Sequence, residues 1–115
     1  MKPESILQRS ICGYLEGLGL FPVASANGAH LAGGKEARFR QINAMKADRM
    51  RPGFPDLTVL GTNGRVGFLE VKTPKGAVQD SQRRMHEQLG VLGHLTAIVR
   101  SVDDTRVALR EWGWL

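Results

Sequence analysis

The amino-acid sequence predicts a single α/β domain in which a central mixed β-sheet is flanked by helices. Apolar residues recur at helical spacing near the N-terminus and again after residue 77, and short apolar runs bounded by Gly and Pro lie between them. The expected order of elements is α, β, α, β, β, α, β, α, which is typical of such a mixed fold. A length of 115 residues allows one hydrophobic core of modest size, so we expect one domain over residues 1–115.

The N-terminal part of the chain predicts a helix followed by an edge strand. Residues 3–18 form the helix because their apolar side chains recur every three or four positions. Pro3 suits the first turn of this helix, and Gly19 suits its end. Residues 20–25 predict a short strand, which Pro22 restricts to a sheet edge because proline has no N–H to donate.

The middle of the chain predicts a loop, a second helix and a turn. Residues 26–34 are rich in small side chains and indicate a loop. Residues 35–48 carry only a partial apolar stripe, so the helix predicted there is weak. Two prolines within residues 51–55 exclude regular helix and indicate a turn.

Two neighbouring strands, 56–60 and 65–72, predict a hairpin closed by Gly61–Gly64. The second strand is apolar on both faces until Glu70, which favours a central place in the sheet. The remaining predicted elements are a helix over 78–92, a strand over 95–100 and a short final helix capped by Asp103 or Asp104.

The composition excludes several classes of protein. Hydrophobic residues make up 42% and charged residues 23% of the chain, as in folded soluble proteins. No apolar run approaches the roughly 20 residues that cross a bilayer, and the N-terminus has no signal-peptide pattern. Cys12 is the single cysteine, so we expect no disulfide, no Cys/His zinc site and a reducing, cytoplasmic compartment.

The net charge of +5 favours a polyanionic partner, because Lys and Arg displace counterions from phosphates. The alternative is a merely basic surface. The cations are grouped, however, around the motif described next. We expect DNA contacts from Lys46, Arg49 and Arg51 before that motif, from Lys75 after it, and from Asn27, for which ordinary loop chemistry is the alternative.

Three residues form the candidate catalytic group: Asp56, Glu70 and Lys72. Glu70 and Lys72 lie two positions apart on a strand and therefore share a face. A three-residue loop at 62–64 would pair Asp56 with Glu70, whereas a two-residue turn would place Asp56 on the other face. Gly64 suits the left-handed position of a three-residue loop, so we predict that loop.

Two facing carboxylates resist ionisation together, and a bound divalent cation removes that penalty. Oxygen ligands favour Mg²⁺ or Mn²⁺, which activate water and polarise a phosphoryl oxygen. Lys72 would orient or deprotonate the attacking water, or steady the charge that grows on phosphate. The alternative is that Asp56 is a turn residue and Glu70 and Lys72 an exposed pair. Charged side chains on an apolar central strand are costly unless they are paired or functional, which favours the active site.

This pattern resembles the PD-(D/E)xK nuclease signature and, more widely, the VRR-NUC family within it. The resemblance rests on Gly53–Leu57, Phe68–Pro74, Gln82, Glu4 with Gln8, and Asn27-Gly28. It implies an αβββαβ-type core with Asp56, Glu70 and the carbonyl of Val71 as metal ligands and Lys72 as the catalytic lysine. It also implies that Gln82 orients water or phosphate and that Glu4 completes the site. From the residues alone, the alternatives are that Gln82 is a solvated helix residue and that Glu4 only favours the positive end of its helix. The spacing of Gln82 from Lys72 favours the functional role.

The function that the resemblance implies is a divalent-metal-dependent DNA nuclease that hydrolyses phosphodiester bonds. Small stand-alone members, from phages or bacteria, look like homodimers that act on branched DNA such as four-way junctions, and we expect the same here. The alternative is a catalytically inactive DNA-binding module, which the presence of every expected catalytic residue type disfavours. An RNA-binding protein is disfavoured because the chain is only 6% aromatic and has no interleaved aromatic motif.

Overall fold

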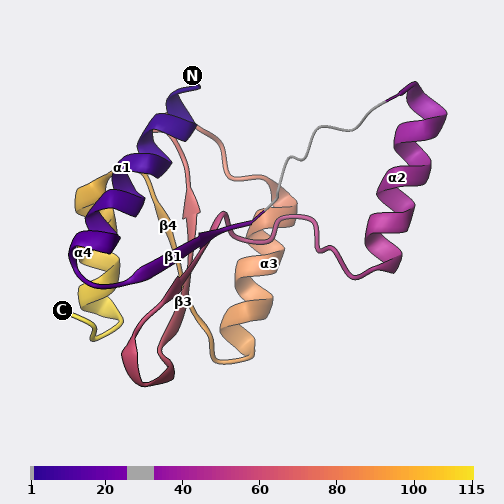
Figure 1. Cartoon of the computed structure of the whole chain (residues 1–115). Coiled ribbons are helices and arrows are strands. Elements are labelled where there is room, and N and C mark those ends of the chain that lie inside the picture. The colour runs from indigo at the N-terminus through magenta and orange to yellow at the C-terminus, as the bar shows by residue number, and fades with distance from the viewer. Residues whose placement is uncertain (1, 26–32) are drawn as a thin grey trace.

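A computed structural model describes residues 2–25 and 33–115 of the chain, and its elements follow the predicted order. The α/β fold class, with helices around a central mixed sheet, is confirmed (Figure 1). The elements are α1 (Pro3–Gly17), β1 (Phe21–Ala24), α2 (Lys35–Ala47), β2 (Leu57–Leu60), the 3₁₀ turn η1 (Thr62–Gly64), β3 (Val66–Val71), α3 (Asp80–Val91), β4 (Leu95–Val99) and α4 (Val102–Glu111). None of the helices described in these ranges is long and apolar enough to span a membrane.

The four strands form one sheet in the order β1-β2-β3-β4. The first three are antiparallel to one another, while β3 and β4 are parallel and are connected through α3. Pro22 lies in β1 at the edge of the sheet, where its missing N–H leaves no ladder bond unmade. β3 lies inside the sheet, as its apolar character on both faces predicts.

The β2–β3 hairpin has the predicted odd-length loop. Leu57 pairs with Leu69, Leu60 pairs with Val66, and the N–H of Gly61 donates to the carbonyl of Arg65 at 2.8 Å. The three residues of η1 remain as the loop, with Gly64 in the left-handed region at φ 73°. One step beyond the Leu57–Leu69 pair, this register sets Asp56 opposite Glu70.

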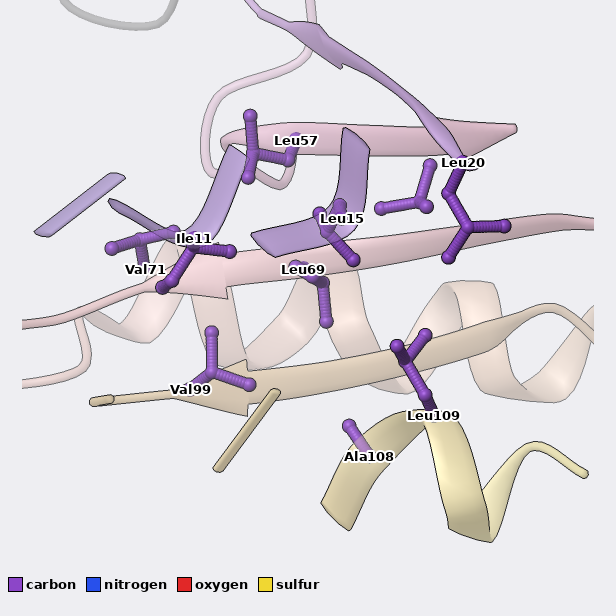
Figure 2. Packing of buried hydrophobic residues seen from close by; sticks show 10 residues of the cluster. Ile11, Leu15, Leu20, Leu57, Leu69, Val71, Val99, Ala108 and Leu109 are labelled. Atoms are coloured by element: carbon purple, nitrogen blue, oxygen red, sulfur yellow. The ribbon is translucent and has the colours of Figure 1, made fainter. Parts of the chain in front are cut away.

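The hydrophobic core lies between the sheet and the helices α1 and α4. Ile11 and Leu15 of α1 are fully buried against the strands, and α4 adds Ala108 and Leu109 (Figure 2). The strand residues of this cluster are Leu57, Val59, Leu69, Val71 and Val99. Because side chains alternate along a strand, the intervening residues of β2 and β3 face the opposite side of the sheet. α3 packs against β4 on that opposite side (Figure 1).

The C-terminal tryptophans pack on this core near the start of β3. A Cβ atom on Gly67 would lie 2.3 Å from Cζ3 of Trp112, so only a glycine allows the ring to lie on the strand. Trp112 packs edge-to-face on Trp114 with ring centroids 5.0 Å apart, and the Arg65 guanidinium lies 5.0 Å from the centroid of the Trp114 ring.

The start of α4 differs from the prediction, because Ser101 is its N-cap and neither Asp103 nor Asp104 is. Ser101 has extended backbone, and its Oγ accepts a hydrogen bond from the N–H of Asp104 at 2.9 Å. The two aspartates lie in the first helical turn. Asp104 uses its Oδ2 to accept from the N–H of Arg100 at 2.9 Å. The helix therefore begins before the two aspartates.

Candidate active site

Asp56, Glu70 and Lys72 converge at one end of the β2–β3 hairpin. Glu70 is the fifth residue of β3 and only 1% exposed, and Lys72, 8% exposed, directly follows that strand. Asp56 directly precedes β2 and is half-buried. Its Oδ2 accepts a hydrogen bond from the N–H of Val71 at 2.8 Å. This bond fixes the Asp56 carboxylate across the end of β3, on the side where Glu70 lies.

The Glu70 carboxyl is held in an environment that disfavours its charge. Burial, as the largest cause, raises the pKa of Glu70 to about 9. The neighbouring Asp56 raises it further, as a hydrogen-bond partner of the protonated form and as a like charge, and Glu4 adds a smaller effect of the same sign. The positive charge of Lys72 acts in the opposite direction. The two carboxylates thus become charged together only with a compensating cation, and without one Glu70 keeps its proton.

One oxygen of Glu70 is a candidate ligand for such a cation. Within the described part of the chain, Oε1 of Glu70 is buried and no N–H or O–H group donates a hydrogen bond to it. A buried carboxylate oxygen without a donor is costly, and binding a cation removes this cost. No group of three or more His, Cys, Asp or Glu side chains among the described residues is arranged to hold a metal ion. A metal here would therefore use Asp56 and Glu70 together with oxygens that are not side chains, such as the carbonyl of Val71.

Gln82 reaches this group from α3. Its Nε2 donates to Oε2 of Glu70 at 3.1 Å, while its Oε1 accepts from the N–H of Gln79 at 2.9 Å. The second bond caps the start of α3 and fixes which end of the amide points to Glu70. Gln82 is therefore joined to the carboxylate pair, and Gln79 is a helix-capping residue.

Glu4 lies in the first turn of α1 and is exposed. It is near enough to Glu70 for its charge to raise the pKa of that carboxyl. The three residues of the catalytic group and the two added by the resemblance, Glu4 and Gln82, thus lie around one place in the fold.

His86 is a neighbour of the site that the sequence analysis did not single out. It lies one helical turn after Gln82 and is half-buried, and its Nε2 is buried without a hydrogen-bond partner among the described residues. Burial lowers the pKa of His86, and the negative charge of Asp56 opposes that effect. The signal that would have found it is its spacing of four residues from Gln82 on the same helix.

Two contacts outside the catalytic group hold its backbone in place. Gly53 has φ 79°, and a Cβ there would lie 2.4 Å from the backbone carbonyl of Ser81 and 2.7 Å from the nitrogen of Gln82. The turn before Asp56 therefore lies directly on the start of α3. On the other side, Nη1 of Arg100 donates to three carbonyls of the loop after Lys72, those of Thr73 at 2.7 Å, Pro74 at 3.3 Å and Gly76 at 2.7 Å.

The described cations that are expected to contact DNA are all exposed and lie before and after the catalytic group in the sequence. Lys46 lies at the end of α2, Arg49 and Arg51 follow it, and all three are exposed. Lys75 is exposed in the loop after Lys72. Asn27 lies outside the described residues. α2 buries none of its residues and stands apart from the sheet (Figure 1).

Comparisons with known proteins bear on the family and the fold. A family model described as the VRR-NUC domain matches residues 26–103. A solved structure described as a VRR_NUC domain is similar with a TM-score of 0.65 and 22% identity, and the match covers 96% of this chain and 97% of that chain. This likeness shows the same fold. No curated protein sequence matches the chain.

Proposed function

Because the chain belongs to the VRR-NUC domain family, and so has a nuclease-type fold and a function related to DNA, we propose that it is a divalent-metal-dependent DNA nuclease. The observation that carries this proposal is the buried Glu70 carboxyl, one oxygen of which receives no hydrogen bond and whose pKa is raised by the neighbouring Asp56 and lowered by Lys72. A purely structural carboxylate in this position would be expected to have a donor for each buried oxygen. In a site that binds a cation, a ligand oxygen receives no hydrogen bond because its lone pair is used for the cation.

The ligands in this proposal are Asp56, Glu70 and the carbonyl of Val71. Their oxygen donors suit Mg²⁺ or Mn²⁺. Such an ion, when bound, polarises the phosphoryl oxygen and lowers the pKa of the attacking water.

The side chains around this place have separate roles. Lys72 holds or accepts a proton at Nζ and balances the charge that develops on the phosphate. Gln82 keeps Glu70 in place through Nε2 and orients water or phosphate, and Glu4 completes the acidic side of the site. Lys46, Arg49, Arg51 and Lys75 bind phosphates, since they are exposed cations. We assign the same role to Asn27 from the resemblance alone.

We further propose that the protein acts on branched DNA as a homodimer. An exposed apolar group on the sheet supports the dimer, because Phe21, Leu60 and Val66 are paired across β1, β2 and β3 and therefore share a face. Val23 lies on the same face two residues after Phe21 and is also exposed. The mass in solution tests the dimer, which requires twice the mass of the chain.

The test of the activity compares Lys72→Ala with the wild type on linear and branched DNA, with Mg²⁺, with Mn²⁺ and with a chelator. We expect metal-dependent cleavage by the wild type and a loss of about 10²-fold or more in Lys72→Ala, with DNA affinity nearly unchanged. Arg110→Ala removes an exposed cation of α4 and serves as the control, with full activity expected. Tight binding without cleavage under every metal condition would instead favour the inactive DNA-binding module.

A further inference from the structure

Helix α2 presents an apolar surface that the described chain does not cover. The side chain of Phe39 is 65% exposed and that of Ile42 is 38% exposed, and the two lie one helical turn apart. No other helix or strand in the described ranges forms an extended contact with α2, which stands away from the sheet (Figure 1). An exposed aromatic on such a helix indicates a partner surface.

The charge around this surface identifies the chemistry of the partner. α2 carries four cations, Lys35, Arg38, Arg40 and Lys46, and one acidic residue, Glu36. Within the described part of the chain, no ion pair within 4.0 Å neutralises any of these cations, because the ion pairs there lie on α3 and α4. Uncompensated cations on an exposed helix fit a polyanion and repel a second copy of the same helix.

The aromatic ring and the cations share one hollow on the helix surface. Its lining residues are Lys35, Glu36, Arg38, Phe39, Arg40 and Ile42. Phe39 lies between Arg38 and Arg40 in sequence, and Lys35 lies one turn before it on the same side of the helix. An exposed ring with cations beside it is the composition of surfaces on which bases stack while the backbone is held by charge.

We propose that α2 is a recognition arm for DNA with an exposed base, in which Phe39 stacks on that base and Lys35, Arg38 and Arg40 bind the flanking phosphates. The inference rests on the proposed nuclease function. It deepens that function by naming the feature of branched DNA that the protein recognises, which is a base with one open face. In a regular duplex, neighbouring base pairs cover each base face, so the ring has nothing to stack on. At a branch or a junction of single and double strands, one base face is open and the ring covers it.

The experiment measures binding of the full chain to fluorescent DNA in a chelator, so that no cleavage occurs. A four-way junction, a splayed-arm duplex and a linear duplex of the same length are compared. We expect Phe39→Ala to weaken binding to the two branched DNAs about tenfold and to change linear-duplex affinity less than twofold. Phe39→Trp keeps the branched-DNA affinity because it keeps a stacking ring, whereas Phe39→Leu loses it although it remains apolar.

The matched control is Leu92→Ala, which removes an apolar side chain of nearly the same exposure, 66%, at the end of α3. We expect wild-type affinity for all three DNAs. A second readout is 2-aminopurine at the branch point, whose fluorescence falls on binding of the wild type and of Phe39→Trp but not of Phe39→Ala.

Three results would overturn the inference: equal losses on linear and branched DNA in Phe39→Ala, no loss on either, or a halved mass in solution for that variant. The last result would mean that α2 packs on a second copy of the chain. A failure of the nuclease proposal looks different, because wild-type protein would then cleave nothing with Mg²⁺ or Mn²⁺ while its preference for branched DNA remained.

Discussion

Replacing Glu70 by glutamine is expected to stabilise the metal-free protein near neutral pH while abolishing cleavage. In the folded state the pKa of Glu70 rises from its ordinary value of 4.5 to about 9, chiefly because the side chain is buried. At pH 7 the folded protein therefore still holds a proton that the unfolded chain has released. The stability falls over the interval from the ordinary pKa of 4.5 to pH 7, which is about 2.5 pH units. At about 1.4 kcal/mol per unit, this lowers the free energy of unfolding by about 3.5 kcal/mol. A glutamine mimics the protonated carboxyl and has no such cost.

The sign of the pH dependence follows from the same shift. A raised carboxyl pKa contributes stability that is complete below pH 4.5 and is lost as the pH rises through about 9. Urea unfolding at pH 5, 7 and 9 in a chelator should therefore show a steady loss of stability in the wild type and a flatter profile in Glu70→Gln. Adding Mn²⁺ should stabilise the wild type, more at higher pH, and leave Glu70→Gln unchanged.

The control for this experiment is Glu111→Gln, because Glu111 is exposed at the end of α4 and should behave as the wild type at every pH. A Glu70→Gln variant that is less stable than the wild type at pH 7, or that keeps the wild-type pH profile, would refute the reasoning. Such a result would mean that Glu70 is ionised in the metal-free fold and that the buried oxygen has another partner.

Three further substitutions test the surroundings of the site. Gly53→Ala must displace the start of α3, because its Cβ would lie 2.4 Å from the backbone of Ser81; we expect cleavage to fall at least tenfold, measured at saturating metal. Gly67→Ala should lower the free energy of unfolding by about 1–3 kcal/mol, because its Cβ would lie 2.3 Å from the Trp112 ring, and Trp112→Leu in the same chain should recover part of this loss in urea unfolding. Arg100→Met leaves the carbonyls of Thr73 and Gly76 without this donor and should cost about 1–3 kcal/mol, with a larger effect on cleavage rate than on DNA affinity.

Much of the site was predictable because it depends on local rules. The register that sets Asp56 opposite Glu70 follows from a three-residue loop in which Gly64 has positive φ. Two-residue alternation then places Lys72 on the same side of the strand as Glu70. The edge position of β1 similarly follows from the chemistry of Pro22. Each of these predictions needed only a few neighbouring residues.

The features that were missed depend on contacts between distant segments. His86 is near enough to Asp56 for that charge to affect its pKa because α3 packs on the sheet in one particular rotation. Its spacing from Gln82 places it on the same helix face, but the sequence of α3 does not set which face meets the site. Arg100 holds the loop after Lys72 across 24 residues or more of sequence, and nothing in its local surroundings marks that role. The cap of α4 was misplaced for a different reason, since Ser101, Asp103 and Asp104 all suit an N-cap and only the extended backbone at Ser101 decides among them.

The hairpin that carries the carboxylate pair also has a consequence for the order in which the protein assembles. Asp56 and Glu70 are joined by a short local connection, and hairpins of this kind form in about 1–10 μs. The parallel pairing of β3 with β4 needs closure of a much longer segment through α3, which is slower. The acidic pair therefore meets before the helices that shield and orient it are in place. Refolding should accordingly be faster in mildly acidic buffer than in alkaline buffer, because protonation relieves the charge repulsion that opposes the earliest step.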